Sequence, residues 1–221
     1  MKILFKFPTR NRWDWFQETL EAYYGMMSED CNFQFLITLD EDDPVMFVPE
    51  VWEYLDYQPK LIYKYGKSKT KIEACNADMD LVDEWDILVL VSDDMIPVIQ
   101  NFDEIIVENM QRYFPDLDGA LHFNDGLLGK HRTITLSIIG RKLYERFGYI
   151  YHPAYKSFFC DNEFTKQVRK LKKVVYIPQV IIEHFWRGNE GDALYRRNAE
   201  MCGIDEITYN NRKVVGFPIK I

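Results

Sequence analysis

A run of five consecutive apolar residues, Ile87–Val91, constrains the fold of this chain more than any other feature. Such a run is typical of a strand that is buried on both faces, as in the middle of a parallel sheet. It ends in Ser92-Asp93-Asp94, and Pro97 prevents a regular continuation. Carboxylates at the carboxyl end of a buried strand lie where open α/β sheets bind ligands. Their mutual repulsion favours a divalent cation with a bound diphosphate, and a solvated turn remains the alternative.

Strand and helix patterns alternate through the first half of the chain. Strands are predicted at residues 3–7, 33–39 and 61–65. A helix pattern follows the first strand, and Thr70-Lys71-Ile72-Glu73 has the form of a capping box that begins another helix. Repeated strand–helix units connect parallel strands through right-handed crossovers. The sequence therefore predicts an α/β fold with a mostly parallel central sheet flanked by helices.

The second half of the chain predicts shorter elements. Strand patterns lie at residues 119–123, 133–139, 174–177 and 180–183. Helix patterns lie at residues 103–114, 141–147, 161–171 and 192–201, and a strand-like tail follows at 214–221. Because no repeat or linker separates the two halves, we expect one domain over residues 1–221.

Composition limits the partners of the chain. Its 221 residues carry a formal net charge of −8, which argues against nucleic acid or an anionic membrane as the main partner. The four cysteines are scattered without the spacing of a zinc site, which favours reduced thiols. The early charge in Met1–Phe7 does not fit a signal peptide, and no apolar run reaches membrane-spanning length. We therefore expect a cytoplasmic protein without an integral membrane segment, and the sequence contains no signal for an oligomeric state.

Polar side chains follow the first two predicted strands at their carboxyl ends. Thr9, Arg10 and Arg12 stand in the loop after the first strand, and Asp40 ends the second. Arginine suits bidentate contacts with phosphate. A carboxylate at the position of Asp40 can accept a hydrogen bond from a base or a ribose hydroxyl. A polar surface loop is the alternative for these residues.

Four residues in later segments add possible phosphate, proton-transfer and metal contacts. Lys71 and Asn76, on the helix before the central strand, could contact a phosphate and a ribose or base. Asp161 opens a helix after an aromatic loop, where the positive helix end would keep a general base ionised, and a simple N-cap is the alternative. His184 ends a β-like run, and neutral imidazole is a common ligand for manganese. A structural histidine is the alternative there.

These motifs stand in an order that is similar to one known family. The matching elements are Pro-Thr-Arg-Asn-Arg at 8–12, Asp40, the Lys71…Asn76 helix, Ser-Asp-Asp at 92–94, Cys-Asp-Asn-Glu-Phe at 160–164 and Glu-His-Phe at 183–185. Together they resemble the GT-A-fold nucleotide-sugar glycosyltransferases, particularly the large inverting family that includes chain-building bacterial enzymes. The resemblance extends to about residue 190 and rests on order and spacing. Val91 departs from it, because the family commonly has an acidic residue there.

The resemblance implies a Rossmann-like GT-A fold and a metal-dependent transfer of sugar from a nucleoside-diphosphate sugar to an acceptor hydroxyl. Asp94 and His184 would hold Mn²⁺ or Mg²⁺, and Asp161 would be the catalytic base. The nucleotide would be held by Thr9, Arg10, Arg12, Asp40, Lys71, Asn76 and Asp93. A UDP-sugar is the favoured donor, and a saccharide or another hydroxyl compound is the acceptor. Inversion follows if the displacement is single and in line, and retention remains open.

The resemblance also suggests how the chain is divided. A nucleotide-binding half at 1–97 would precede a smaller acceptor and catalytic half at 98–190, with a C-terminal helix and tail at 191–221. Lys130, His131 and Arg132 are expected to form a flexible lid over the donor. A catalytically degenerate binding or scaffold module is one alternative function. A sugar nucleotidyltransferase is less favoured, because Pro8–Arg12 lacks the glycines of its phosphate loop.

Overall fold

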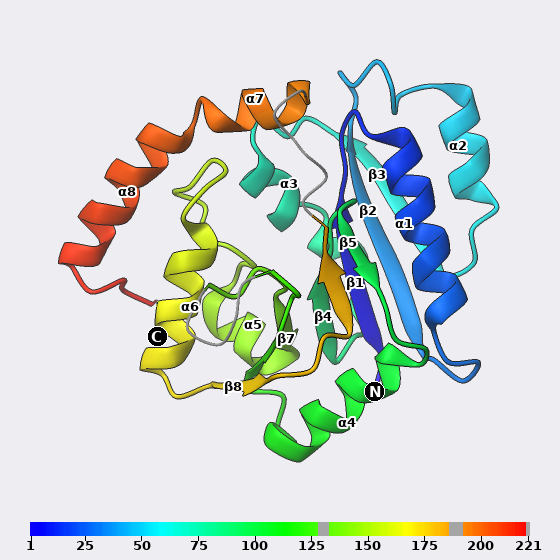
Figure 1. Ribbon diagram of the computed structural model, residues 1–221. Helices are drawn as coiled ribbons and strands as arrows, with labels where there is room; N and C mark the ends of the chain where they lie inside the picture. Colours follow the sequence, from blue (N-terminus) through cyan, green and yellow to red (C-terminus); the bar gives the residue numbers. More distant parts are fainter. Residues whose placement is uncertain (128–132, 186–191, 220–221) are drawn as a thin grey trace.

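A seven-stranded sheet forms the middle layer of the molecule (Figure 1). The computed structural model describes residues 1–127, 133–185 and 192–219. The strand order is β3-β2-β1-β4-β7-β6-β8. These strands are β1 (Ile3–Pro8), β2 (Phe33–Asp40), β3 (Leu61–Gly66), β4 (Ile87–Leu90), β6 (Ala120–Phe123), β7 (Ile138–Gly140) and β8 (Val174–Ile177). The predicted α/β fold with a mostly parallel sheet is confirmed.

The sheet changes direction at β7. Strands β3, β2, β1 and β4 are parallel, whereas β7 runs antiparallel to both β4 and β6. The strand predicted at 133–139 was too long, because only its last two residues enter β7. Before them, the backbone N–H of Ile134 donates to the Thr165 hydroxyl of a neighbouring helix. At Ile134 the backbone therefore donates to a helix side chain, while Leu136 still packs into the core.

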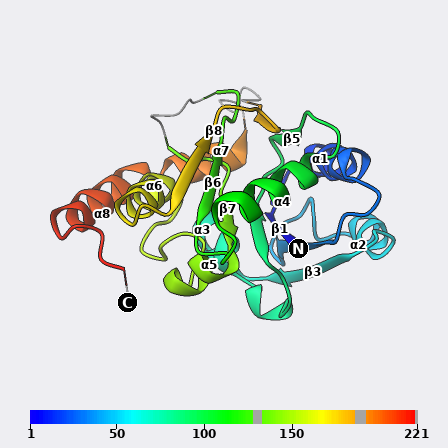
Figure 2. The same ribbon diagram turned by 90° about the horizontal axis from the view of Figure 1, so that it is seen from below.

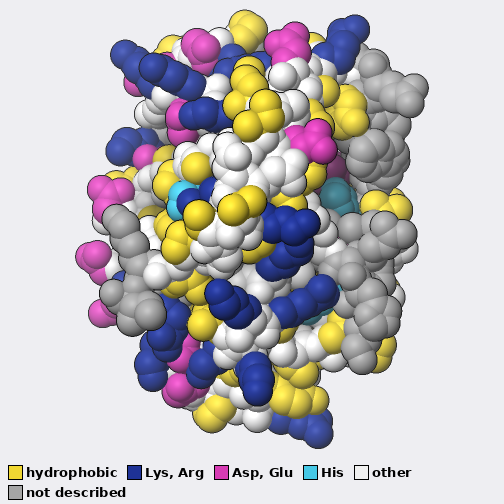
Figure 3. All heavy atoms as spheres, turned by 90° about the vertical axis from the view of Figure 1, so that its left-hand side faces the viewer, with side chains coloured by type: hydrophobic (Ala, Val, Ile, Leu, Met, Phe, Trp, Pro, Cys, Tyr) yellow, Lys and Arg dark blue, Asp and Glu magenta, His cyan; other side chains and the backbone are white. Residues whose placement is uncertain are grey.

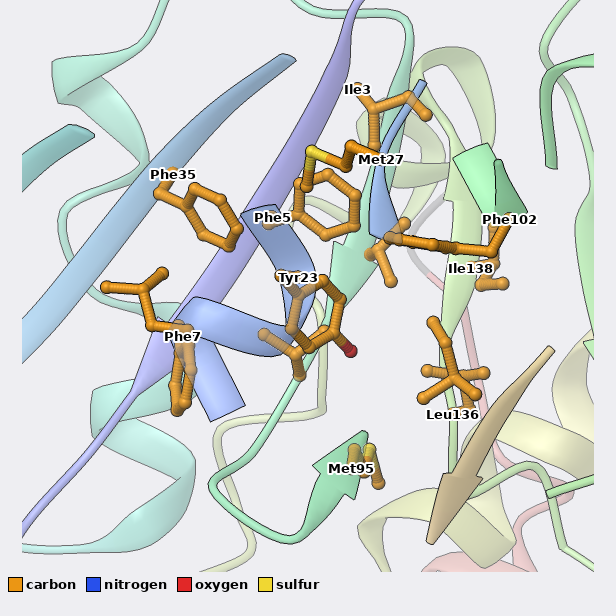
Figure 4. Packing of buried hydrophobic residues seen from close by; sticks show 14 of the residues in the cluster. Ile3, Phe5, Phe7, Tyr23, Met27, Phe35, Met95, Phe102, Leu136 and Ile138 are labelled. Atoms are coloured by element: carbon orange, nitrogen blue, oxygen red, sulfur yellow. The ribbon is translucent and has the colours of Figure 1, made fainter. Parts of the chain in front are cut away.

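Helices cover both faces of the sheet (Figures 1 and 2). Alternate residues of a strand point to opposite faces. Phe5 packs on the first face, with its ring centroid 5.0 Å from that of Phe35 and 5.4 Å from that of Tyr23 (Figure 4). Leu4 belongs to the core of the second face. The first face is covered by α1 (Trp13–Met26), α2 (Pro49–Asp56) and α4 (Phe102–Tyr113), and the second by α3 (Lys71–Asn76), α5 (Arg141–Phe147) and α6 (Cys160–Lys170).

One charged side chain lies inside this framework. Lys6 on β1 is 0% exposed, and its ammonium donates to the Thr38 hydroxyl of β2. Thr38 in turn donates to Asp78 at 2.6 Å, just before the short 3₁₀ helix η1 (Met79–Leu81). Burial is the main cause that lowers the pKa of Lys6 to about 8, although the carboxylate of Asp78 opposes it.

A second, two-stranded antiparallel sheet lies beside the main one. It pairs β5 (Met95–Pro97), which follows the two aspartates, with β9 (Ile182–His184). Met95 pairs with His184, so the ribbon brings the end of β9 next to the end of β4. The backbone N–H of Phe185 also donates to the Asp94 carbonyl at 2.7 Å.

Two helices follow β9 in the described part of the chain. They are α7 (Ala193–Ala199) and α8 (Cys202–Val214). The strand predicted at 214–221 was wrong for its described residues, which contain the last residue of α8 and no strand. Because α8 turns charged residues inward and leaves Ile204 and Ile207 exposed, its pattern does not resemble a helix that packs an apolar face on a core. No helix among the described residues is both long and apolar enough to cross a membrane.

Candidate active site

A cavity of about 260 Å³ opens at the carboxyl ends of β1, β2 and β4. This is the place where open α/β sheets bind their ligands. All predicted site residues except Asn76 and Asp161 line it, namely Thr9, Arg10, Arg12, Asp40, Lys71, Asp93, Asp94 and His184. Segments separated widely in sequence thus meet at one cavity.

Of the two adjacent aspartates, Asp93 is the one that forms an ion pair with an arginine. Its Oδ1 accepts from Arg12 Nη1 at 2.6 Å, and the Thr9 hydroxyl lies 3.5 Å from Oδ2. Burial raises the pKa of Asp93 to about 6, and the charge of Asp94 adds to this rise against the opposing effect of Arg12. The carboxylate is therefore held next to a cation in a poorly solvated place.

The surroundings of Asp94 lower its pKa, whereas those of Asp93 raise it. Its Oδ2 lies 3.3 Å from His184 Nε2, and its Oδ1 accepts from the Ser92 hydroxyl at 2.5 Å. Burial alone would raise its pKa, but the contacts with His184 and Ser92 and the charge of Lys71 lower the pKa of Asp94 to about 2. Asp94 is therefore ionised at every physiological pH.

Two further cations border the cavity. Arg10 donates to Asp40 at 2.7 Å and to Asp42 at 2.5 Å, while Asp40 also accepts from the Ser68 backbone N–H at 3.1 Å. Lys71, the first residue of α3, forms no ion pair among the described residues. Burial lowers the pKa of Lys71, but the neighbouring Cys75, Cys160, Asp94 and Asp161 outweigh it and raise the pKa above its usual value. An anionic ligand would therefore meet a fully charged ammonium.

Asp94 and His184 are the residues that could hold a divalent cation. Among the described residues, no three His, Cys, Asp or Glu side chains gather as a metal-binding group. A pair of protein ligands suits Mg²⁺ or Mn²⁺ when substrate phosphates supply the remaining oxygens. His184 Nδ1 is buried and lacks a hydrogen-bond partner in the described parts of the chain, so Nε2 coordination would leave an unpartnered N–H. The carboxylate of Asp94 is therefore the stronger of the two ligands.

Asp161 lies in the first turn of α6, next to the cavity rather than in its lining. Its Oδ1 accepts from the backbone N–H of Asn162 at 2.8 Å. Burial is the main cause that raises the pKa of Asp161, and it outweighs that hydrogen bond and the charges of Lys71 and His184. A raised pKa makes the carboxylate a better proton acceptor.

Asn76 does not line the cavity. Its Oδ1 accepts from the backbone N–H groups of Ile150 and Tyr151, and its Nδ2 donates to the Tyr151 carbonyl at 2.7 Å. These bonds tie α3 to the loop before α6 and use the side-chain oxygen and one of the two N–H groups of the amide. The predicted contact of Asn76 with a ribose or base stays a prediction, and the bonds give this residue a structural role as well.

The C-terminal segment contributes a wall of the cavity that the sequence did not predict. The lining residues from α7 are Leu194, Tyr195, Arg197 and Asn198. Asp192 precedes this helix, caps it by accepting from Leu194 N at 2.9 Å, and also accepts from Arg12 Nε at 2.8 Å. Arg12 thus connects Asp93 with Asp192. The sequence predicted a helix at 192–201, but no sequence signal gave its position over the cavity.

The predicted lid residues Lys130, His131 and Arg132 lie outside the described residues. In the aromatic loop before α6, Tyr151 and Tyr155 are buried, and Tyr155 donates to Glu163 at 2.7 Å. These rings are therefore core residues, although Tyr151 also borders the cavity.

Comparisons with known proteins were made for the sequence and for the fold. No protein-family model and no curated protein matches the sequence. The fold is similar to mannosyltransferase PcManGT from Pyrobaculum calidifontis, in complex with GDP-Man and Mn²⁺, with a TM-score of 0.68 at 15% identity over 95% of this chain and 64% of that chain. It is also similar to S. aureus TarS 1-349 in complex with UDP-GlcNAc, with a TM-score of 0.65 at 12% identity over 89% of this chain and 64% of that chain. The chain thus spans less than two thirds of these neighbours and has a GT-A-like glycosyltransferase fold.

Proposed function

We propose that this chain transfers a sugar from a nucleoside-diphosphate sugar to an acceptor hydroxyl with the help of a divalent cation. The observation that carries the proposal is the single cavity in which Asp94 and His184 face Arg12 and Lys71. Acidic and basic side chains at one site can bind a cation and a diphosphate together. The similar folds of PcManGT, with GDP-Man and Mn²⁺, and TarS, with UDP-GlcNAc, support this choice of ligand.

The nucleotide would lie along the ends of β1, β2 and β4. Asp40 is assigned to the base and Asp93 to the ribose, while Arg10, Arg12 and Lys71 would meet the phosphates. Arg10 pairs with Asp40 in the free protein, so a base that binds Asp40 would release this guanidinium toward the ligand. We favour UDP as the nucleotide and a cytoplasmic setting for the reaction.

Asp94 and His184 would hold the cation, which neutralises negative charge on the departing diphosphate when it is bound. Asp94 keeps its charge because its pKa is low, and the contact with His184 is one of the causes that lower it. Lys71 would place a further positive charge near the leaving group.

Asp161 would accept the proton of the acceptor hydroxyl. In the same step the acceptor oxygen forms a bond to the anomeric carbon, while the bond from that carbon to the diphosphate oxygen breaks. Because one displacement from the opposite face exchanges these bonds, we infer inversion at the anomeric carbon. The raised pKa of Asp161 is consistent with a carboxylate that takes up this proton.

Thermal unfolding with UDP, GDP, CMP and dTDP, each with Mn²⁺, Mg²⁺ or EDTA, tests the proposal. At about 100 times Kd a nucleotide raises the free energy of unfolding by about 2.7 kcal/mol, or the Tm by about 5–10 °C for a chain of this size. We expect this shift only with metal, and we expect Mn²⁺ alone to give none, because two protein ligands do not complete its coordination.

Asp94→Asn should abolish the metal-dependent shift, and Asp116→Asn is the matched control because Asp116 is an exposed carboxylate paired with Lys142. Release of nucleoside diphosphate from the stabilising sugar nucleotide should then depend on an acceptor. A folded protein that no nucleotide stabilises would contradict the proposal and favour a binding or scaffold module.

A further inference from the structure

Asp205 on α8 is a buried carboxylate that the proposed reaction does not use. It is 0% exposed, and its two oxygens accept from three consecutive backbone N–H groups, those of Lys156 at 2.8 Å, Ser157 at 2.7 Å and Phe158 at 2.8 Å. In the described parts of the chain, no cation pairs with it. Charge-assisted bonds from backbone donors thus carry the whole stabilisation of this anion.

The three amides belong to the junction between the cavity and Asp161. Ser157 and Phe158 line the cavity, and the Lys156 carbonyl accepts from Ile72 N at 3.2 Å, next to Lys71. Phe159 then takes the left-handed conformation with φ of 62°, which a phenylalanine rarely adopts. Helix α6 begins at the next residue and carries Asp161 in its first turn. The conformation of this loop therefore fixes where the Asp161 carboxylate lies.

Helix α8 is placed to deliver Asp205 to this loop. Asp205 is its one buried residue, while Ile204 and Ile207 are 56% and 64% exposed. Lower on the same helix, Arg212 forms two 2.7 Å bonds with the buried Glu163 of α6. Figure 3, which views the molecule from the side where α8 lies, shows exposed hydrophobic groups among Lys and Arg side chains. Helix α8 is therefore attached by the buried contacts of Asp205 and Arg212 and by Tyr209, whose ring centroid lies 5.4 Å from that of Phe159.

We propose that Asp205 is a positioning residue that holds the loop 156–159, and through it Asp161, in the geometry for proton transfer. This inference rests on the proposed function. Its carboxylate organises three parallel N–H groups that would otherwise point at no acceptor. Asp93 and Asp94 lie on a different segment and form no hydrogen bond with this loop, although Ser157 and Phe158 line the same cavity. We therefore expect the loss to fall mainly on kcat rather than on donor binding.

The test is Asp205→Asn in the full chain, because the new amide presents an N–H to donors that need an acceptor. We expect kcat for sugar transfer to fall about 10–100-fold, since a displacement of about 1 Å costs that much. KM for the donor and the nucleotide-induced thermal shift should stay within twofold. Backbone amide exchange at 156–158 should become faster.

Asp103→Asn is the matched control. Asp103 is also a buried carboxylate that accepts a backbone N–H, that of Ser28 at 2.9 Å, and neither residue lines the cavity. It should lose comparable stability with unchanged kcat when both variants are compared at equal folded fraction.

An equal fall in kcat in both variants, or an unchanged kcat in Asp205→Asn, would overturn the positioning role. Slow amide exchange at 156–158 in Asp205→Asn would overturn it even without an assay of transfer. Failure of the proposed function is a separate result, in which the wild-type protein shows neither nucleotide-induced stabilisation nor transfer.

Discussion

The adjacent residues Asp93 and Asp94 have different electrostatic environments in this molecule. Burial raises the pKa of Asp93 to about 6, whereas Asp94, for which burial acts in the same direction, has its pKa lowered to about 2 by His184, Ser92 and Lys71. The sequence predicts the pair at the end of a buried strand. It does not predict the difference, because that depends on which aspartate the side chains of His184, Ser92 and Arg12 contact.

We predict that His184→Asn weakens nucleotide-dependent Mn²⁺ binding by about 10–100-fold, the usual effect of losing a group that supports or contacts a metal ligand. The imidazole contact that lowers the pKa of Asp94 would be lost with the ring. The measurement is a Mn²⁺ titration at saturating nucleotide. His122→Asn is the control, since His122 is buried but does not line the cavity. Equal affinities in both variants would argue against a role of His184 at the cation.

Lys6 predicts an alkaline pH dependence of stability. Its pKa is about 8 in the folded protein and about 10.4 in an unfolded chain, so the unfolded state binds more protons between these values. The contribution of Lys6 to the free energy of unfolding therefore rises with pH, by roughly 2 kcal/mol between pH 7 and 9.5. Urea unfolding of the wild type and of Lys6→Met across this range measures it. A difference between them that stays constant with pH would contradict the prediction.

At the scale of elements, the two-stranded ribbon of β5 and β9 builds the side of the cavity that carries Asp94 and His184. It connects the segment after Asp94 with the segment that ends in His184, and Ile182 of β9 is 1% exposed in the core beneath. The ribbon is short, with three paired positions, so its stability depends on this packing more than on its hydrogen bonds.

We predict that Ile182→Ala lowers the free energy of unfolding by about 2–4 kcal/mol through loss of buried surface and the cavity left behind. The same truncation at Ile207, which is 64% exposed on α8, should change it by less than about 0.5 kcal/mol. Urea denaturation of both variants makes the comparison. Similar values for the two would show that the ribbon does not contribute to the cooperative core.

Local patterns predicted some elements correctly and failed for others. The capping box at the start of α3 is present in part, since Glu73 N donates to the Thr70 hydroxyl at 3.2 Å. The Glu73 carboxylate accepts from the backbone N–H of Lys69, one residue before the N-cap, at 2.8 Å. Helix α8 was missed because its inward contacts are made by Asp205, Arg212 and the single aromatic residue Tyr209, which do not form a periodic apolar face. Patterns based on apolar burial do not detect a helix whose most buried side chain is charged.

At the scale of the molecule, the site combines three distant parts of the chain. The sequence could predict the site residues at the strand ends, because polar residues that directly follow an apolar run form a local pattern. The wall from α7 and the ion pairs of Arg12 with Asp93 and Asp192 depend on tertiary contacts across the whole chain. Asn76 lies on the predicted helix, but its side chain forms hydrogen bonds within the protein and does not line the cavity.

We predict that Asp192→Ala lowers the free energy of unfolding by about 1–2 kcal/mol, because it removes the N-cap of α7 and one partner of Arg12. It should also weaken nucleotide binding, since α7 would no longer be held against the cavity. Urea denaturation and calorimetric titration measure the two effects. Unchanged values in both would show that α7 keeps its place without this residue.

The order of the elements along the chain has a consequence for biosynthesis. All strands of the main sheet and both partners of the ribbon precede residue 192, whereas the wall of the cavity and the acceptor for the 156–158 amides come from residues 192–219. Because translation proceeds from the N-terminus, the sheet segments leave the ribosome before α7 and α8 do. Without residues 192–219 the cavity would lack its α7 wall and the 156–158 amides would lack their acceptor. The pocket is therefore complete only when these two helices have docked on the sheet.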